Sequence, residues 1–108
     1  MLPYTIDEIK KRITPVAQKY GLAAVYLFGS YARGEANENS DIDLLVDLSG
    51  SKVHGILLGG LYVDLEEALE TKIDLITVAS LDQRPLYPSQ KLFQETVKRE
   101  RMKIYAAA

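Results

Sequence analysis

The segment from Gly29 to Val46 restricts the fold of this chain more than any other. It contains a Gly-Ser turn, Gly29-Ser30, after one apolar run and two closely spaced aspartates, Asp41 and Asp43, at the start of the next. Residues i and i+2 of a strand point to the same face. Asp41 and Asp43 are therefore expected to lie side by side, where two carboxylates repel each other unless a cation lies between them.

The residue types in this segment favour a site for a metal ion and a phosphate. Paired carboxylates suit Mg²⁺, which commonly takes one or two carboxylates together with substrate phosphates. Ser30 can bind phosphate through its hydroxyl and nearby free amides, and Gly29 lets the backbone approach closely; the alternative for Ser30 is a plain helix cap. Arg33 lies one turn later, where it can meet a phosphate or form a surface salt bridge with Glu35 or Glu38.

A third aspartate, Asp74, lies in the apolar run Lys72 to Val78. Charged side chains are rarely buried unless they are paired or bound to metal. If this run forms a strand beside the second one, Asp41, Asp43 and Asp74 can hold two Mg²⁺ ions, or one ion and a general base. The alternative is that Asp74 pairs with Lys72 or ends the strand. With the Asp41/Asp43 pair nearby, the pattern predicts a metal-dependent enzyme acting on a nucleotide.

The periodicity of apolar residues predicts a single α+β domain over residues 1–108, an α/β sandwich of order α-β-α-β-α-β-α. Its small mixed sheet of three or more strands would carry helices packed on it. Pro15 predicts a kink or short break in the first helix, and the glycines between Ser49 and Gly60 predict a loop. We expect helices at Thr5–Tyr20, Leu61–Thr71 and Lys91–Ala107, a helical turn at Ser30–Gly34, and strands at Ala23–Phe28, Asp41–Leu48 and Lys72–Val78.

Charge and hydropathy argue against nucleic acid as the main partner and against a membrane-spanning segment. The chain has 108 residues and a formal net charge of -2, which argues against a broad basic surface and so against nucleic acid as the main partner. It contains no cysteine, which fits a reducing cytoplasm. No apolar run approaches the roughly 18 residues that a membrane span needs. We therefore expect a cytoplasmic protein.

The motifs resemble those of the nucleotidyltransferase superfamily that includes DNA polymerase beta. Gly-Ser-Tyr-Ala-Arg-Gly, Ser-Asp-Ile-Asp-Leu-Leu-Val and the later strand aspartate are most similar to its minimal form, the MNT-domain proteins. The likeness runs from about residue 22 to residue 78. It implies that Asp41, Asp43 and Asp74 bind Mg²⁺, with Asp74 nearest the attacking hydroxyl, and that Gly29 and Ser30 hold the triphosphate.

The resemblance also implies a biological setting. Minimal nucleotidyltransferases often accompany a helical HEPN-domain RNase, and neutralise this toxin by transferring AMP from ATP to one of its tyrosines. Two alternatives stay open on the sequence. One is the catalytic half of a two-subunit small-molecule (antibiotic-type) nucleotidyltransferase. The other is a non-catalytic module that neutralises a toxin by occlusion. Each is compatible with a homo- or hetero-oligomer.

Overall fold

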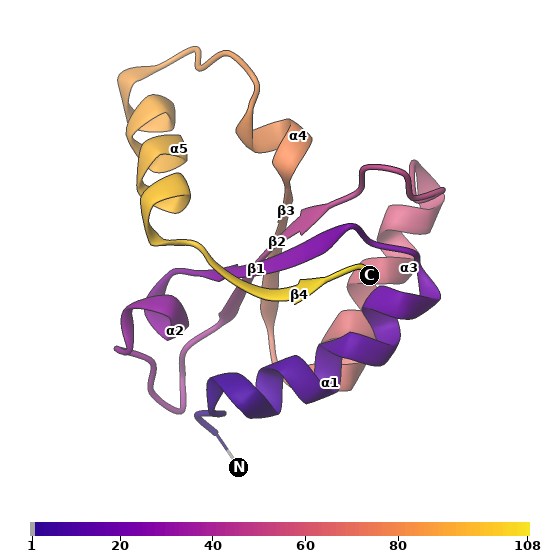
Figure 1. The fold of residues 1–108 in the computed structure, drawn as a ribbon. Coiled ribbons are helices and arrows are strands. Elements are labelled where there is room, and N and C mark those ends of the chain that lie inside the picture. The colour runs from indigo at the N-terminus through magenta and orange to yellow at the C-terminus, as the bar shows by residue number, and fades with distance from the viewer. Residues whose placement is uncertain (1) are drawn as a thin grey trace.

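A computed structural model describes residues 2–108 as a four-stranded mixed sheet with helices on both faces (Figure 1). The strands lie in the order β3-β2-β1-β4; β1 pairs antiparallel with β2 and β4, and β2 pairs parallel with β3. The α+β class is thereby confirmed. The elements are α1 (Ile6–Lys19), β1 (Ala24–Phe28), α2 (Ser30–Arg33), β2 (Ile42–Asp47), α3 (Ile56–Leu69), β3 (Ile73–Thr77), α4 (Val78–Leu81), α5 (Pro88–Glu100) and β4 (Met102–Ala106).

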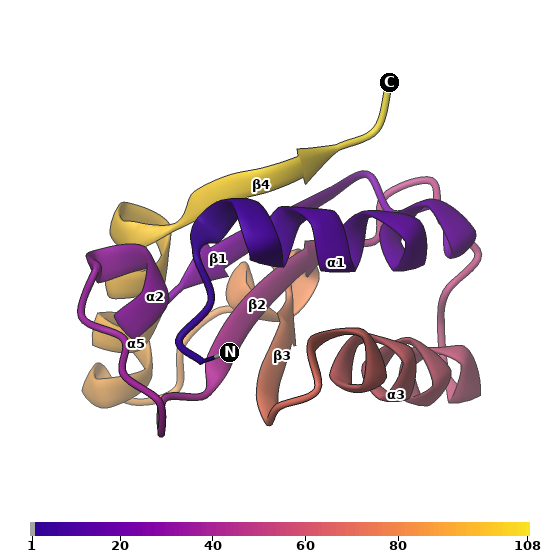
Figure 2. The same cartoon turned by 90° about the horizontal axis from the view of Figure 1, so that it is seen from below.

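The two faces of the sheet bury different sets of side chains. Helices α1 and α3 cover one face, and α4 and α5 lie toward the other (Figures 1 and 2). Alternate residues of β2, Ile42, Leu44 and Val46, join the larger core beneath α1 and α3. Leu45 points the other way and packs with Phe28 in a smaller cluster beside α5. The period-2 pattern of β2 therefore places Asp43 on the face that α5 partly covers.

Helix α1 begins as the sequence predicts and continues through its proline. Thr5 and Glu8 form a reciprocal capping box. The helix is not interrupted at Pro15, so the expected short break is wrong. Its buried face holds Ile9 and Ile13 at 0% exposure, and this burial outweighs the backbone hydrogen bond that proline cannot make.

The last predicted helix is wrong in its C-terminal part. Helix α5 ends at Glu100, and Met102–Ala106 instead forms β4 on the outer edge of β1. Ile104 is buried against the larger core, and the Ala107 amide donates to the Ala23 carbonyl at 2.9 Å. Pairing with β1 satisfies backbone groups that the edge of the sheet would otherwise leave open, and this outweighs the helical pattern of the local sequence.

Helix α3 starts earlier than the glycines predict. It begins at Ile56, so Gly59 and Gly60 lie inside it rather than in the expected loop. A Cβ at Gly60 would lie 3.2 Å from the Tyr20 hydroxyl, so the missing side chain allows α3 to approach α1 closely. In the part of the chain that the structure describes, no helix is long and apolar enough to cross a membrane.

Candidate active site

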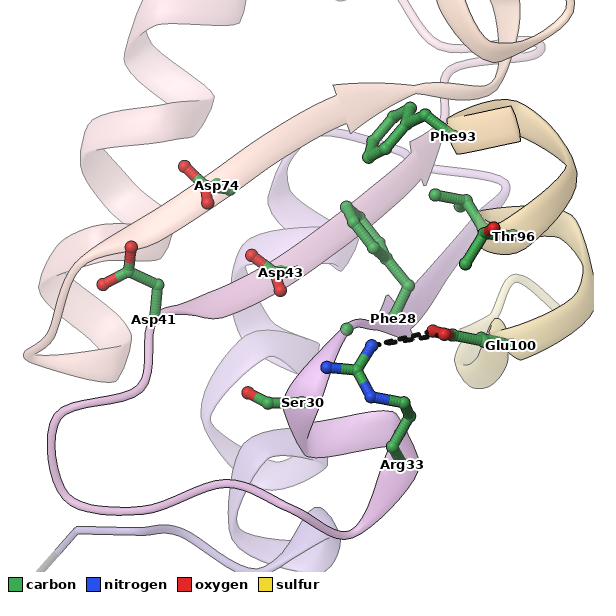
Figure 3. Close-up of a pocket in the computed structure, with 11 residues that line it drawn as sticks. Phe28, Ser30, Arg33, Asp41, Asp43, Asp74, Phe93, Thr96 and Glu100 are labelled. Carbon is green, nitrogen blue, oxygen red and sulfur yellow. Dashed lines mark hydrogen bonds and ion pairs between the residues drawn. The ribbon is translucent and has the colours of Figure 1, made fainter. Parts of the chain in front are cut away.

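The three predicted aspartates lie on neighbouring strands and line one pocket (Figure 3). Asp41 immediately precedes β2, Asp43 lies within it, and Asp74 lies on β3. Asp43 and Asp74 are register partners in the parallel pair, so the predicted neighbourhood of these two strands is confirmed. Among residues 2–108, no three acidic, histidine or cysteine side chains gather tightly enough to hold a metal ion as they stand. The carboxylates therefore share a cavity without converging on one point.

The remaining walls of the pocket come from the end of β1, from α2 with the glycine before it, and from α5. The cavity has a volume of about 400 Å³, which is within the range of small-molecule sites. Gly29, Ser30 and Arg33 line it on the α2 side, as the sequence predicts. The sequence does not single out the α5 residues that line the opposite side, although their spacing of three, four and seven residues marks one helical face. These residues are Phe93, Thr96, Val97 and Glu100.

Gly29 is required by the close approach of β2 to the start of α2. Its φ of 74° and ψ of -151° lie in a region that side-chain-bearing residues rarely adopt. A Cβ built at this position would lie 1.9 Å from Oδ2 of Asp43. The backbone at Gly29 thus lies against the Asp43 carboxylate, which joins the Gly-Ser turn and the acidic cluster into one site.

The acidic cluster changes the proton affinity of its central member. Burial, followed by the neighbouring carboxyl groups of Asp74 and Asp41, raises the pKa of Asp43 from 3.8 to about 7. The nearby Arg33 guanidinium acts in the opposite direction. Carboxylate oxygens that are crowded in this way are hard donors whose repulsion a divalent cation relieves. The chemistry of these donors therefore suits Mg²⁺, while the three side chains as they stand do not form a ready metal site within residues 2–108.

This crowding predicts a pH-dependent effect on stability. Because the folded-state pKa of Asp43 lies above the unfolded value, the folded protein binds more protons between pH 4 and 7, and its stability falls as the pH rises through that window. Asp43→Asn is expected to raise the Tm of protein in EDTA at pH 8, with little change at pH 4. Thermal unfolding at both values checks this. A variant that is less stable at pH 8, or stabilised equally at both values, would contradict it.

Arg33 forms ion pairs at the edge of the pocket. Its Nε donates to Glu35 at 2.6 Å, which is the surface pair that the sequence offered as the alternative to phosphate binding. Its Nη1 also donates to both carboxylate oxygens of Glu100, at 3.2 and 3.0 Å. The second pair joins α2 to α5 across 67 residues of sequence, a separation that no local sequence pattern bridges. Phosphate binding by Arg33 stays a prediction.

Comparison with known proteins identifies relatives of this chain. Residues 9–103 match the family described as "Nucleotidyltransferase domain". The chain is 43% identical over 77 residues to "Putative protein adenylyltransferase MJ0435" of Methanocaldococcus jannaschii, a match that covers 70% of this chain and 81% of the relative. It is 35% identical over 89 residues to "Protein adenylyltransferase MntA" of Thermococcus cleftensis, covering 75% of this chain and 85% of the relative.

Solved structures show the same fold. One described as a "putative minimal nucleotidyltransferase" superposes with a TM-score of 0.66 at 29% identity, over 94% of this chain and 98% of that one. A chain from a toxin–antitoxin crystal structure with AMP-PNP superposes with a TM-score of 0.65 at 24% identity, over 91% of this chain and 73% of that one. The resemblance seen in the motifs is thereby confirmed, and the chain belongs to the nucleotidyltransferase domain family.

Proposed function

We propose that this nucleotidyltransferase is Mg²⁺-dependent, that it transfers AMP from ATP to a tyrosine of a HEPN-type toxin, and that it acts as the antitoxin. The observation that carries this proposal is that Ser30 and the carboxylates of Asp41, Asp43 and Asp74 line one pocket. Relatives named protein adenylyltransferase support AMP as the transferred group and protein as the acceptor. One chain of a complex of a tri-AMPylated Shewanella oneidensis HEPN toxin with an MNT antitoxin has the same fold, with a TM-score of 0.62 at 19% identity.

Asp41, Asp43 and Asp74 would hold the metal, with two ions expected from the three carboxylates. When bound, Mg²⁺ supplies neutralisation of the phosphate charge and stabilises the oxygens between which the nucleotidyl group moves. Ser30 and the backbone at Gly29 would hold the triphosphate. A serine hydroxyl and free amides are suitable donors to phosphate oxygens, and Gly29 carries no side chain that would fill this space.

In the proposed transfer, the tyrosine oxygen forms a bond to the α-phosphorus of ATP, and the bond from that phosphorus to the departing diphosphate breaks. Asp74 is exposed, and in this proposal its carboxylate would take the phenolic proton. Asp41 is also exposed. The open side of the cluster therefore needs a second molecule to exclude water and to orient the acceptor, and a partner protein meets both needs.

The proposal is tested by mixing this protein with its cognate helical partner, ATP and Mg²⁺, and recording the intact mass of the partner. We expect the mass to rise by one or more AMP units. The increment should disappear when Asp41→Asn replaces the parent chain, because the metal loses a ligand. Mapping of the modified peptide should place AMP on a tyrosine.

Two other results would each overturn the proposal. Inhibition of the partner without a change in mass would show a module that acts by occlusion. AMP recovered only on an added aminoglycoside or another small molecule would show a small-molecule nucleotidyltransferase.

A further inference from the structure

The active-site pocket has two chemically different ends. Asp41, Asp43 and Asp74 line one end, where phosphate and metal are expected. At the other end, α5 presents one face to the cavity, with Phe93 followed one turn later by Thr96 (Figure 3). A nucleotide has the same division, because its triphosphate is charged and its base is a flat, largely apolar ring system.

The ring of Phe93 is oriented by a buried neighbour yet stays accessible. Phe28 is 7% exposed and contacts Phe93 edge to face, with the ring centroids 6.3 Å apart and the ring planes at 81°. Phe93 itself is 47% exposed. Burial of a large apolar side chain is favourable. A half-exposed aromatic ring that is held in place at a ligand cavity is therefore a preformed surface on which a flat ring can stack.

A bridge between α2 and α5 fixes the two ends of the pocket relative to each other. Arg33 lies on the same short helix as Ser30, and its guanidinium bonds to both oxygens of Glu100, two turns after Phe93. The Glu100 side chain is only 17% exposed, which strengthens such a pair relative to one in open solvent. The pair holds the stacking surface near the residues expected to bind phosphate.

We propose that α5 is the nucleobase-binding element of this enzyme: the base stacks on Phe93 and lies beside Thr96, while the triphosphate extends to Ser30. This inference rests on the proposed nucleotide substrate and is independent of the acceptor. Stacking on an aromatic ring accepts every base, and its strength grows with the area covered. ATP and GTP should therefore bind more tightly than UTP.

A second hollow on the sheet offers a competing place for the base. It has a volume of about 360 Å³ and is lined by the two phenylalanines, Asp43, Asp74, Leu75 and Ile76. Ser30 and Arg33 line the first cavity and do not line the second within residues 2–108. Of these two hollows in residues 2–108, the first combines the stacking ring with the expected phosphate ligands.

The test is calorimetric titration with ATP, UTP and inorganic triphosphate in Mg²⁺ buffer. Phe93→Ala should weaken ATP binding about tenfold and leave triphosphate binding within about twofold. The reason is that the variant removes the ring that contacts the base and removes no contact with the phosphates. It should also reduce the preference for ATP over UTP. Phe93→Tyr should restore ATP binding. Leu92→Ala is the matched control, since Leu92 is 63% exposed on the same helix and does not line the cavity.

A second pair of variants separates the two hollows. Thr96→Phe fills the first cavity and should weaken ATP binding without affecting triphosphate. Ile76→Ala enlarges the second hollow and should leave ATP binding unchanged. A loss of ATP binding in Ile76→Ala with none in Thr96→Phe would place the base in the second hollow and overturn the inference.

The remaining outcomes distinguish this inference from the proposed function. If Phe93→Ala stays folded by thermal unfolding but weakens ATP and triphosphate equally, or weakens neither, the inference fails and the function stands. If the parent chain binds neither ATP nor triphosphate, both fail. If ATP binding follows the expected pattern but no AMP reaches the partner, the proposed acceptor fails and the base site stands.

Discussion

Asp43→Asn is expected to slow nucleotidyl transfer by about a thousandfold at saturating Mg²⁺, because a bound metal contributes several kcal/mol of transition-state stabilisation and each 1.36 kcal/mol is a factor of ten. Asparagine has nearly the shape of aspartate but lacks its charge. The backbone of Gly29 should therefore keep its contact with residue 43, and the fold should survive. The rate of AMP transfer and the Tm, measured on the same preparation, check the two parts of this expectation.

Asp47→Asn is the matched control. Asp47 lies on β2 and shares a face with Asp43, but its carboxylate accepts a hydrogen bond from the Ser49 amide at 2.9 Å and it does not line the active-site pocket. Removing its charge should leave the transfer rate unchanged. If Asp43→Asn is as active as the parent chain in saturating Mg²⁺, the assignment of Asp43 as a metal ligand is wrong.

The part of the site that sequence analysis predicted depends on short-range rules. Asp41 and Asp43 line the same pocket, as strand alternation predicts, although Asp41 lies just before β2. Gly29 and Ser30 follow β1 directly. Asp74 needed one further assumption, that its strand lies beside β2, and the parallel register of Asp43 with Asp74 confirms it. No long-range information beyond this single pairing was needed to gather the acidic cluster.

The part of the site that the sequence does not reveal, on α5, depends on long-range packing. Phe93 and Val97 have the helical spacing of core residues, and only the placement of α5 shows that Phe93 faces a cavity. Glu100 belongs to a run of charged residues, which is typical of a solvated helix face, yet it pairs with Arg33 across the pocket. β4 could not be predicted for a similar reason. Its pairing with β1 joins residues far apart in the sequence, and Met102–Ala106 alone does not encode that pairing.

Gly29→Ala is expected to reduce nucleotidyl transfer about a hundredfold. The cause is steric, whereas Asp43→Asn acts through the loss of a charge. The added Cβ would lie 1.9 Å from Oδ2 of Asp43, a separation that real atoms do not tolerate, so either the carboxylate or the turn must move. A displacement of about 1 Å in a catalytic group can cost about a hundredfold in rate. The backbone at φ 74° and ψ -151° adds strain of about 1–3 kcal/mol to the folded state.

Gly34→Ala separates the steric effect from the general cost of a left-handed residue. Gly34 ends α2 at φ 73° and ψ 23°, and a Cβ there would have no neighbour within 4 Å. Alanine at this position should cost about 1–2 kcal/mol of stability and leave the transfer rate of the folded protein unchanged. Urea unfolding and the rate of AMP transfer, measured for both variants, give the comparison. Equal rates in folded Gly29→Ala and Gly34→Ala would show that the Asp43 carboxylate can leave the Gly29 backbone without loss of function. A rate that falls only in Gly29→Ala would show that the Gly-Ser turn fixes the position of the central aspartate as well as bordering the phosphate site.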